Sequence, residues 1–127
     1  MKKELLMSYI KANVAPILID FMFGVDIPNA IVIPGSIDAK ELVGHYESLD
    51  YKPPKWYDEL ITNNHNLLVI DLIDSIKKEE QAKFIEILKY RKIDTFELPE
   101  DCVIIVTTKE INKDKINEEI YSLLAQI

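Results

Sequence analysis

A chain of 127 residues with 48% apolar and 29% charged residues has the composition of an ordinary globular domain, so we expect one core over residues 1–127. The net charge of −7 argues against a general nucleic-acid surface, because phosphate binding needs a positive field. Apolar runs are too short to span a membrane, and no signal peptide follows Met1, so we expect a cytoplasmic protein. The single cysteine, Cys102, lies in an apolar run and is expected to be buried and reduced.

The first half of the chain alternates helical spacing with short apolar runs. Apolar residues at helical spacing predict a helix near the N-terminus, and two apolar runs after it predict buried strands. The paired prolines 53 and 54 exclude a helix interior or a central strand. The elements predicted here are a helix over 2–12, strands over 17–19 and 30–33, a short helix from Ser36 or Asp38 to about Tyr46, a loop over 51–56 and a helix over 55–62.

The second half repeats the alternation with stronger signals. The run at 67–70 is apolar on both faces and ends at Asp71, and the run at 103–106 has no polar alternation either. Between them, apolar positions at 82–88 predict a helix capped by Asp74 or Ser75, then a turn at 98–101. A last helix, capped by Asn112, is predicted from the apolar stripe that ends at Ile127.

Strands that are apolar on both faces and separated by helices are typical of a parallel sheet covered on two sides. The pattern therefore predicts an α/β fold, a three-layer sandwich with a mainly parallel sheet. Ligands of such sheets bind beyond the carboxyl ends of the strands. The polar residues expected there are Asp20, Asp71 and the run Thr107-Thr108-Lys109.

The segment Leu67-Leu-Val-Ile-Asp71-Leu72-Ile73-Asp74 resembles the Walker B strand of AAA+ ATPases, a family with the P-loop NTPase fold. The likeness continues through 81–88, which resembles the following helix, and through 98–108, which resembles the sensor 1 strand. It covers roughly residues 30–110 in matching order and spacing. The resemblance implies a P-loop NTPase-like sheet, ATP and magnesium as ligands, and assembly into oligomers.

Four departures from the family pattern weigh against catalysis. No Gly-x-x-x-x-Gly-Lys-Ser/Thr motif is present, so the main phosphate-binding loop is missing. Leu72 stands where the family has a water-activating glutamate, and Lys109 stands at the sensor 1 position. The single arginine, Arg91, comes too early to match an arginine finger, and nothing after Ile127 matches a helical lid. The chain is therefore expected to be one AAA+-like α/β domain without a lid.

Each candidate ligand also has a plain structural interpretation. Asp71 could hold magnesium, or it could end its strand by accepting backbone N–H groups. Asp74 is expected to cap a helix, Thr107 and Thr108 to bond backbone at the strand end, and Lys109 to be solvated or to attract an anion. If a nucleotide binds, its ligands are expected among Asp71, Asp74, Thr108 and Lys109, with Asp71 as the metal ligand.

Aromatic residues around the Pro-Pro segment form a second candidate site. Tyr51, Trp56 and Tyr57 flank the prolines, and such residues either pack a loop down or anchor a protein interface. These three are the predicted partner-binding residues. The two histidines and Cys102 lack the spacing of a zinc site.

Three functions follow as hypotheses. The first is a non-catalytic AAA+-like scaffold or assembly subunit that binds another protein or further copies of itself, with no cofactor. The second is a divergent or truncated magnesium-dependent ATPase, including a fragment whose P-loop lies upstream of Met1. The third is a receiver-like signalling domain with Asp71 as phosphoacceptor, although only Asp20 ends the first strand, where receivers carry an acidic pair.

Overall fold

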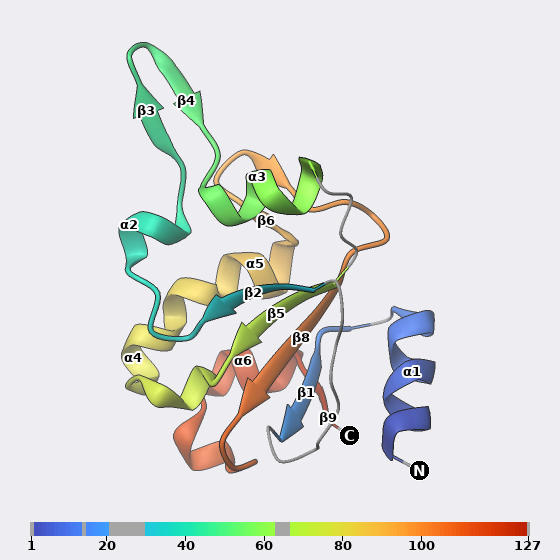
Figure 1. The fold of residues 1–127 in the computed structure, drawn as a ribbon. Coiled ribbons are helices and arrows are strands. Elements are labelled where there is room, and N and C mark those ends of the chain that lie inside the picture. The colour runs from blue at the N-terminus through green and yellow to red at the C-terminus, as the bar shows by residue number, and fades with distance from the viewer. Residues whose placement is uncertain (1, 14, 21–29, 63–66, 127) are drawn as a thin grey trace.

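The computed structural model describes residues 2–13, 15–20, 30–62 and 67–126, and the structural statements below concern these residues. Its centre is a five-stranded sheet with the order β2-β5-β8-β1-β9 (Figure 1). Every strand pairing in this sheet is parallel, as the sequence predicted. The strands are β1 Ile17–Asp20, β2 Ala30–Pro34, β5 Leu67–Asp71, β8 Val103–Thr108 and β9 Ala125–Gln126.

The two faces of the sheet are covered unequally. One face carries the larger core, in which strand residues such as Ile70 and Val106 pack against most of the helices. The other face carries a smaller core, where Val69 and Ile105 lie with Leu6 of the first helix. The helices on the larger core are α2 Ala39–Leu42, α3 Lys55–Thr62, α4 Lys78–Gln81, α5 Ile85–Tyr90 and α6 Glu118–Leu123, and the helix on the smaller core is α1 Lys2–Ala12 (Figure 1).

The predicted three-layer α/β architecture is therefore confirmed, because strand residues alternate between two buried cores. At the β2 edge the smaller core ends, and Val32 is 56% exposed there. In the part of the chain that is described, no helix is both long and apolar enough to cross a bilayer.

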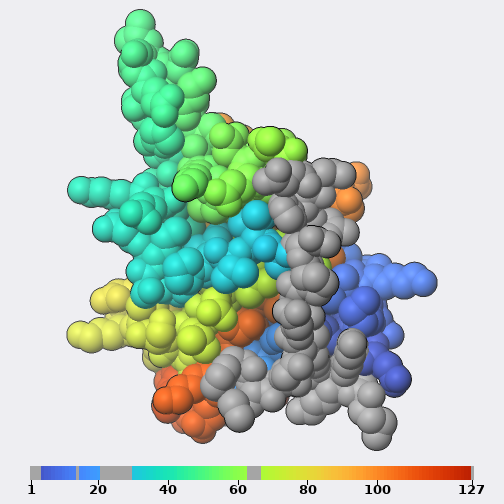
Figure 2. Space-filling view, in the orientation of Figure 1, coloured from blue at the N-terminus to red at the C-terminus, as the bar shows by residue number. Residues whose placement is uncertain are grey.

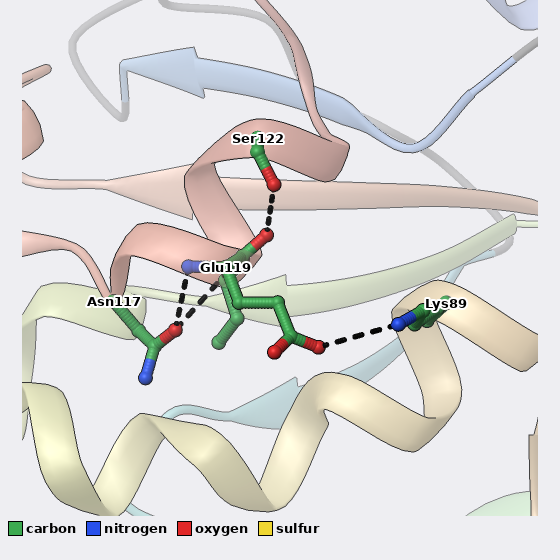
Figure 3. Close-up of polar contacts among 5 residues, drawn as sticks. Lys89, Asn117, Glu119 and Ser122 are labelled. Atoms are coloured by element: carbon green, nitrogen blue, oxygen red, sulfur yellow. Dashed lines mark hydrogen bonds and ion pairs between the residues drawn. The ribbon is translucent and has the colours of Figure 1, made fainter.

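The C-terminal helix is shorter than predicted and has a different cap. Asn112 caps the 3-10 turn η4 Lys113–Lys115 instead, and Asn117 caps α6 by accepting from the backbone N–H groups of Glu119 and Ile120 at 3.0 and 3.2 Å (Figure 3). An exposed ion pair between Lys89 Nζ and Glu119 Oε2, 3.8 Å apart, joins α5 to α6 and contributes little stability. The chain then leaves the helix at Leu124 and pairs with β1 as β9. The predicted terminal residue of the stripe, Ile127, lies outside the described residues.

Two antiparallel hairpins were not predicted. The first joins β3 His45–Glu47 to β4 Asp50–Lys52, and the second joins β6 Lys92–Ile93 to β7 Phe96–Glu97. The predicted helix to Tyr46 is wrong, because α2 ends at Leu42 and Val43 is already extended. Its predicted cap Asp38 is confirmed, since the carboxylate accepts from Lys40 N at 2.9 Å. The β3–β4 hairpin projects from the body (Figures 1 and 2).

The helix after β5 is broken into short pieces. A 3-10 turn, η2 Ile73–Ser75, comes first, and another, η3 Ala82–Phe84, separates α4 from α5. The predicted cap of this helix is wrong: the residue before α4 is Lys77, which makes no side-chain cap bond. Asp74 lies inside η2, where its carboxylate has a different partner.

Candidate functional site

The strand order places a switch point beside β1. From β1 the chain crosses to the far edge at β2, returns through β5 and β8, and then passes β1 to reach β9. Ligands of open α/β sheets bind where connections diverge in this way, beyond the carboxyl ends of the strands. Asp20 of β1 and Thr108 of β8 are paired in register at that point.

A phosphate-binding loop in this fold would follow the first strand. Here that stretch is residues 21–29, which lie outside the described residues and contain one glycine, Gly24, and no lysine, serine or threonine. In a sheet with this strand order the place of a P-loop is therefore after Asp20, at the end of β1.

Asp71 and Thr107 bind each other at the end of the central strands. The hydroxyl of Thr107 donates to Asp71 Oδ1 at 2.8 Å and accepts from the backbone N–H of Leu72, also at 2.8 Å. Thr107 is only 7% exposed, so both bonds form away from bulk water. The expectation that Thr107 would bond backbone at the strand end is met, but it also engages the carboxylate proposed as the metal ligand.

Leu72, at the position of the family's glutamate, has a left-handed backbone with φ 50° and ψ 60°. A leucine in this region is uncommon and costs free energy. Gly35 packs directly against this bend: its N–H donates to Asp71 O at 2.6 Å, and an added Cβ would lie 2.6 Å from Leu72 O. The bend is therefore fixed from two sides, by Gly35 and by Thr107.

Asp74 and Lys109 form the second contact between these loops. The backbone N–H of Lys109 donates to both carboxylate oxygens of Asp74, at 3.0 and 3.2 Å. Thr108 is fully buried, and its hydroxyl donates to the backbone oxygen of Glu110 at 2.9 Å, as expected for a strand end. Lys109 itself is exposed, in line with a solvated side chain.

The four predicted nucleotide ligands thus lie at one edge of the sheet, as parallel strands require. Three of them, Asp71, Asp74 and Thr108, have protein partners, and Lys109 is bound through its backbone. Within the described ranges no group of three or more His, Cys, Asp or Glu side chains is arranged to hold a metal ion. Magnesium keeps several of its waters and takes one or two protein carboxylates, and the carboxylate at the end of β5, Asp71, accepts from the Thr107 hydroxyl in this structure.

Arg91 and Cys102 lie together at the opposite end of β8. Arg91 has φ 57° at the C-cap of α5, and its Nη2 donates to the backbone oxygens of Pro99 and Cys102 at 3.0 and 2.6 Å. Burial raises the pKa of the Cys102 thiol to about 11, against a smaller lowering by Arg91. The thiol is protonated at neutral pH and unreactive, and the guanidinium holds a turn together far from the carboxyl edge.

The predicted partner residues form an aromatic cluster that joins the two hairpins. Tyr51 stacks on Phe96 with ring centroids 5.8 Å apart, and Tyr57 contacts the same ring at 5.5 Å. Trp56 is 6% exposed, and its Nε1 donates to Leu42 O at 3.0 Å. Tyr51 lies in β4 and the other two in α3, so the predicted loop over 51–56 shrinks to the two prolines.

Asp94 fixes the base of the β3–β4 hairpin. Its Oδ2 accepts from the Tyr51 hydroxyl at 2.6 Å and from Gly44 N at 2.9 Å. The hydrogen bond to Asp94 is the main reason that the pKa of Tyr51 rises from 10.0 to about 12. Tyr57 donates to Glu97 O at 2.5 Å, and burial and then Glu97 raise its pKa.

A cleft of about 580 Å³ opens beside this base. Its apolar lining includes Val43, Pro54 and Trp56, and its charged lining includes two lysines and two glutamates. The cleft therefore lies next to the predicted partner residues, one of which, Trp56, lines it. Its complete lining is Ile37, Lys40, Glu41, Val43, His45, Pro54, Lys55, Trp56 and Glu59.

Comparison with known proteins identifies similar folds but assigns the chain to no family. No protein-family model matches the sequence, and no curated protein matches it significantly. A crystal structure of a candidate ATPase from Cytophaga hutchinsonii ATCC 33406 superposes with a TM-score of 0.62 and 11% identity, covering 99% of this chain and 45% of that one. NtrX from Brucella abortus gives a TM-score of 0.50 and 14% identity, covering 77% of this chain and 25% of that one.

At these identities the likeness concerns the fold alone. The chain has an ATPase-like α/β fold and spans less than half the length of either structure. The superposition does not extend the ATPase activity named for the first of these structures to this chain, because one fold carries many unrelated activities.

Proposed function

We propose that this chain is a non-catalytic AAA+-like domain, in which the sheet is a scaffold and the function is to bind another protein. The observation that carries the proposal is the bond between Asp71 and Thr107, reinforced by Leu72. The carboxylate that would hold magnesium is bonded to a buried hydroxyl, and the next residue has no group that accepts a proton.

The phosphate-binding side supports the same conclusion. A nucleotide triphosphate carries its affinity in backbone N–H groups and a lysine that surround the phosphates, and magnesium supplies charge neutralisation when bound. The stretch after β1 that would provide them has no lysine. Lys109 is a cation at the same edge, but one exposed ammonium does not replace that cradle.

Calorimetric titration with Mg-ATP and with Mg-ADP tests the proposal directly. We expect no binding heat up to about 1 mM nucleotide, which corresponds to a binding free energy weaker than about 4 kcal/mol. The matched variants are Asp71→Ala and Lys109→Ala, which remove the two groups most able to contribute. Micromolar binding that either variant abolishes would overturn the proposal and favour a divergent magnesium-dependent ATPase.

A gain-of-function variant makes the test sharper. Leu72→Glu restores the acidic residue of the resembled family, and we expect no ATP hydrolysis above background, because the phosphate cradle is still missing. Measurable hydrolysis by this variant, absent from a Leu72→Gln control, would show that a single substitution had removed activity from a working nucleotide site.

A further inference from the structure

The tip of the β3–β4 hairpin combines three features that cost stability. Glu47 and Asp50 are directly opposite in the antiparallel pair, where like charges repel. Ser48, in the turn, has φ 57°, a region where glycine is favoured. Leu49 is 95% exposed. Glu47 Oε1 lies 3.1 Å from His45 Nε2 on the same strand, but an exposed contact of this kind offsets little of the cost. Local rules that fail together in one element mark places where function outweighs stability.

The base of the same hairpin is held firmly. Asp94 accepts from the Tyr51 hydroxyl and from Gly44 N, and Tyr51 stacks on Phe96 with an angle of 11° between the rings. The space-filling view shows the hairpin standing clear of the body as a narrow projection (Figure 2). A fixed base and an apolar tip in water are the features of an element that inserts into a partner.

A receptor of suitable chemistry lies beside that base. The cleft has an apolar lining that includes Val43, Pro54 and Trp56, and two exposed lysines, Lys40 and Lys55, border it. Within the described part of the chain neither lysine forms an ion pair. The apolar part of this lining complements Leu49, and its two lysines complement the two carboxylates beside Leu49, although two glutamates belong to the same lining.

We infer that two copies of this chain associate by exchanging hairpins, so that Leu49 of each copy enters the cleft of the other. Glu47 and Asp50 then face Lys40 and Lys55 across each contact. The inference rests on the proposed function, because it names the protein partner as a second copy.

The geometry favours reciprocal exchange. From the hairpin base to the tip the strand rises about 10 Å, since each residue adds about 3.4 Å. Two hairpins lying side by side in opposite directions therefore bring each tip to the other's base, where the cleft is. A two-fold contact of this kind closes with two subunits. Glu41 and Glu59 also line the cleft, so the apolar tip supplies affinity and the charges set orientation.

Sedimentation equilibrium of the full chain, from about 1 µM to about 1 mM, tests for the dimer at twice the 14.7 kDa monomer mass. Trp56 is the only tryptophan and lines the cleft, so its fluorescence should change over the same concentration range. We expect Leu49→Asp to raise the dissociation constant at least tenfold. The matched control is Met7→Asp in α1, which is 55% exposed and distant from the cleft, and which should leave the constant unchanged.

Mixing two defective variants distinguishes exchange from any other dimer. Leu49→Asp alone and the double variant Lys40→Glu/Lys55→Glu alone each break both contacts of a reciprocal pair. Their mixture restores one intact contact, from the wild-type tip of one to the wild-type cleft of the other, so heterodimers should form more tightly than either homodimer. Urea unfolding of each variant should match the parent, since these side chains are exposed.

A chain that stays monomeric over the whole range, or a Leu49→Asp variant that dimerises as the parent does, would overturn the inference. No gain on mixing would likewise exclude reciprocal exchange. Neither result bears on nucleotide binding, so a monomer that also fails to bind Mg-ATP would reject the hairpin exchange and leave the proposed function intact.

Discussion

The carboxyl edge of the sheet and the β3–β4 hairpin use similar residues in opposite ways. Both contain carboxylates, a hydroxyl residue, a leucine and a non-glycine residue with positive φ. At the edge, Asp71 and Asp74 accept hydrogen bonds from the neighbouring β8 strand and loop. At the hairpin tip, Glu47 and Asp50 face each other, and Leu49 extends into water.

The two regions differ in whether neighbouring groups stabilise a residue with a left-handed backbone. The left-handed bend at Leu72 is surrounded by hydrogen bonds from Thr107 and by the close approach of Gly35. Ser48 is also left-handed, with φ 57°, and among the described residues no side chain forms a hydrogen bond with the backbone of the exposed tip around it as Thr107 does at Leu72. The residues predicted as nucleotide ligands therefore take part in hydrogen bonds within the fold, whereas the unexplained cost lies in a hairpin that no motif marks.

Gly35→Ala should cause the largest loss of stability at the carboxyl edge of the sheet. The new methyl would lie 2.6 Å from Leu72 O and 3.0 Å from Asp71 O, and both are backbone atoms that cannot rotate away. We expect a loss of about 3 kcal/mol in urea unfolding, the upper part of the usual cost of overpacking.

Gly44→Ala is its counterpart at the hairpin base. Two of its three close contacts would be to the ring of Tyr51, which can shift, although Lys52 O at 2.8 Å cannot. The loss should be smaller and should be accompanied by a weaker Tyr51–Asp94 contact. Equal losses for the two variants would mean that the edge is no more rigid than the hairpin base.

Thr107→Val measures the bond that carries the functional proposal. The variant keeps the shape of the side chain but removes a buried donor and acceptor, leaving Asp71 and the N–H of Leu72 without their partner. We expect a loss of about 2 kcal/mol, because one of the two bonds is charge-assisted. In a double-mutant cycle with Asp71→Asn the losses should fall short of additive.

Thr108→Val is the matched control for that variant. Thr108 is also buried, but within the described ranges its hydroxyl bonds a single group, the backbone oxygen of the exposed residue Glu110. Its loss should be less than half as large. If the two variants lose the same free energy of unfolding, Asp71 is not held by Thr107, and the carboxylate is available to a ligand.

The sheet could be predicted from sequence because its signal is local. The runs at 67–70 and 103–106 are short and apolar at every position, which is typical of strands buried on both faces. Strand β9 and hairpin β6–β7 were missed because each strand has two residues, too few for periodicity. The β3–β4 hairpin was missed because all its residues are exposed, so no alternation marks it.

The candidate site was predictable in place but not in its contacts. Carboxyl ends of parallel strands meet at one edge, so Asp71 and Thr107 had to be neighbours once the fold was assumed. Their bond depends on the register of β5 and β8, which no local pattern encodes. Asp74 was assigned as a cap for the same reason, since its partner Lys109 is 35 residues away.

Leu72→Gly relieves the backbone strain at the edge, and its effect is measured against Leu72→Ala. Both variants lose the packing of the half-buried leucine side chain, so the difference between them isolates the backbone. A non-glycine residue in the left-handed region costs about 1–2 kcal/mol, and glycine loses about 0.5–1 kcal/mol through the entropy of the unfolded chain. We expect Leu72→Gly to be more stable than Leu72→Ala by about 0.5 kcal/mol in urea unfolding. Equal stabilities would show that the bend at Leu72 carries no backbone strain.

The ionisation of Tyr51 reports on the base of the hairpin, because its hydroxyl bonds Asp94 there. Its pKa of about 12, against 10.0 for an ordinary tyrosine, arises first from the hydrogen bond to Asp94. Because the folded-state value is the higher one, stabilisation by this bond is complete below pH 10.0 and is lost as the pH rises through about 12. Ultraviolet titration should therefore show a late phase that contains Tyr51, and Tyr51→Phe should remove its part while leaving that of Tyr57, whose pKa is also raised.

Asp94→Asn separates this contact from simple burial of the ring. Asparagine can still accept from Tyr51 and Gly44 but carries no charge, so the Tyr51 pKa should fall towards 10.0, while the stack on Phe96 is kept. If the hairpin is an interaction element on a fixed base, the same variant should weaken dimerisation less than Leu49→Asp does, because it loosens the base and leaves the tip unchanged. A variant that restored an ordinary Tyr51 pKa and yet abolished dimerisation entirely would place the contact at the base of the hairpin and not at Leu49.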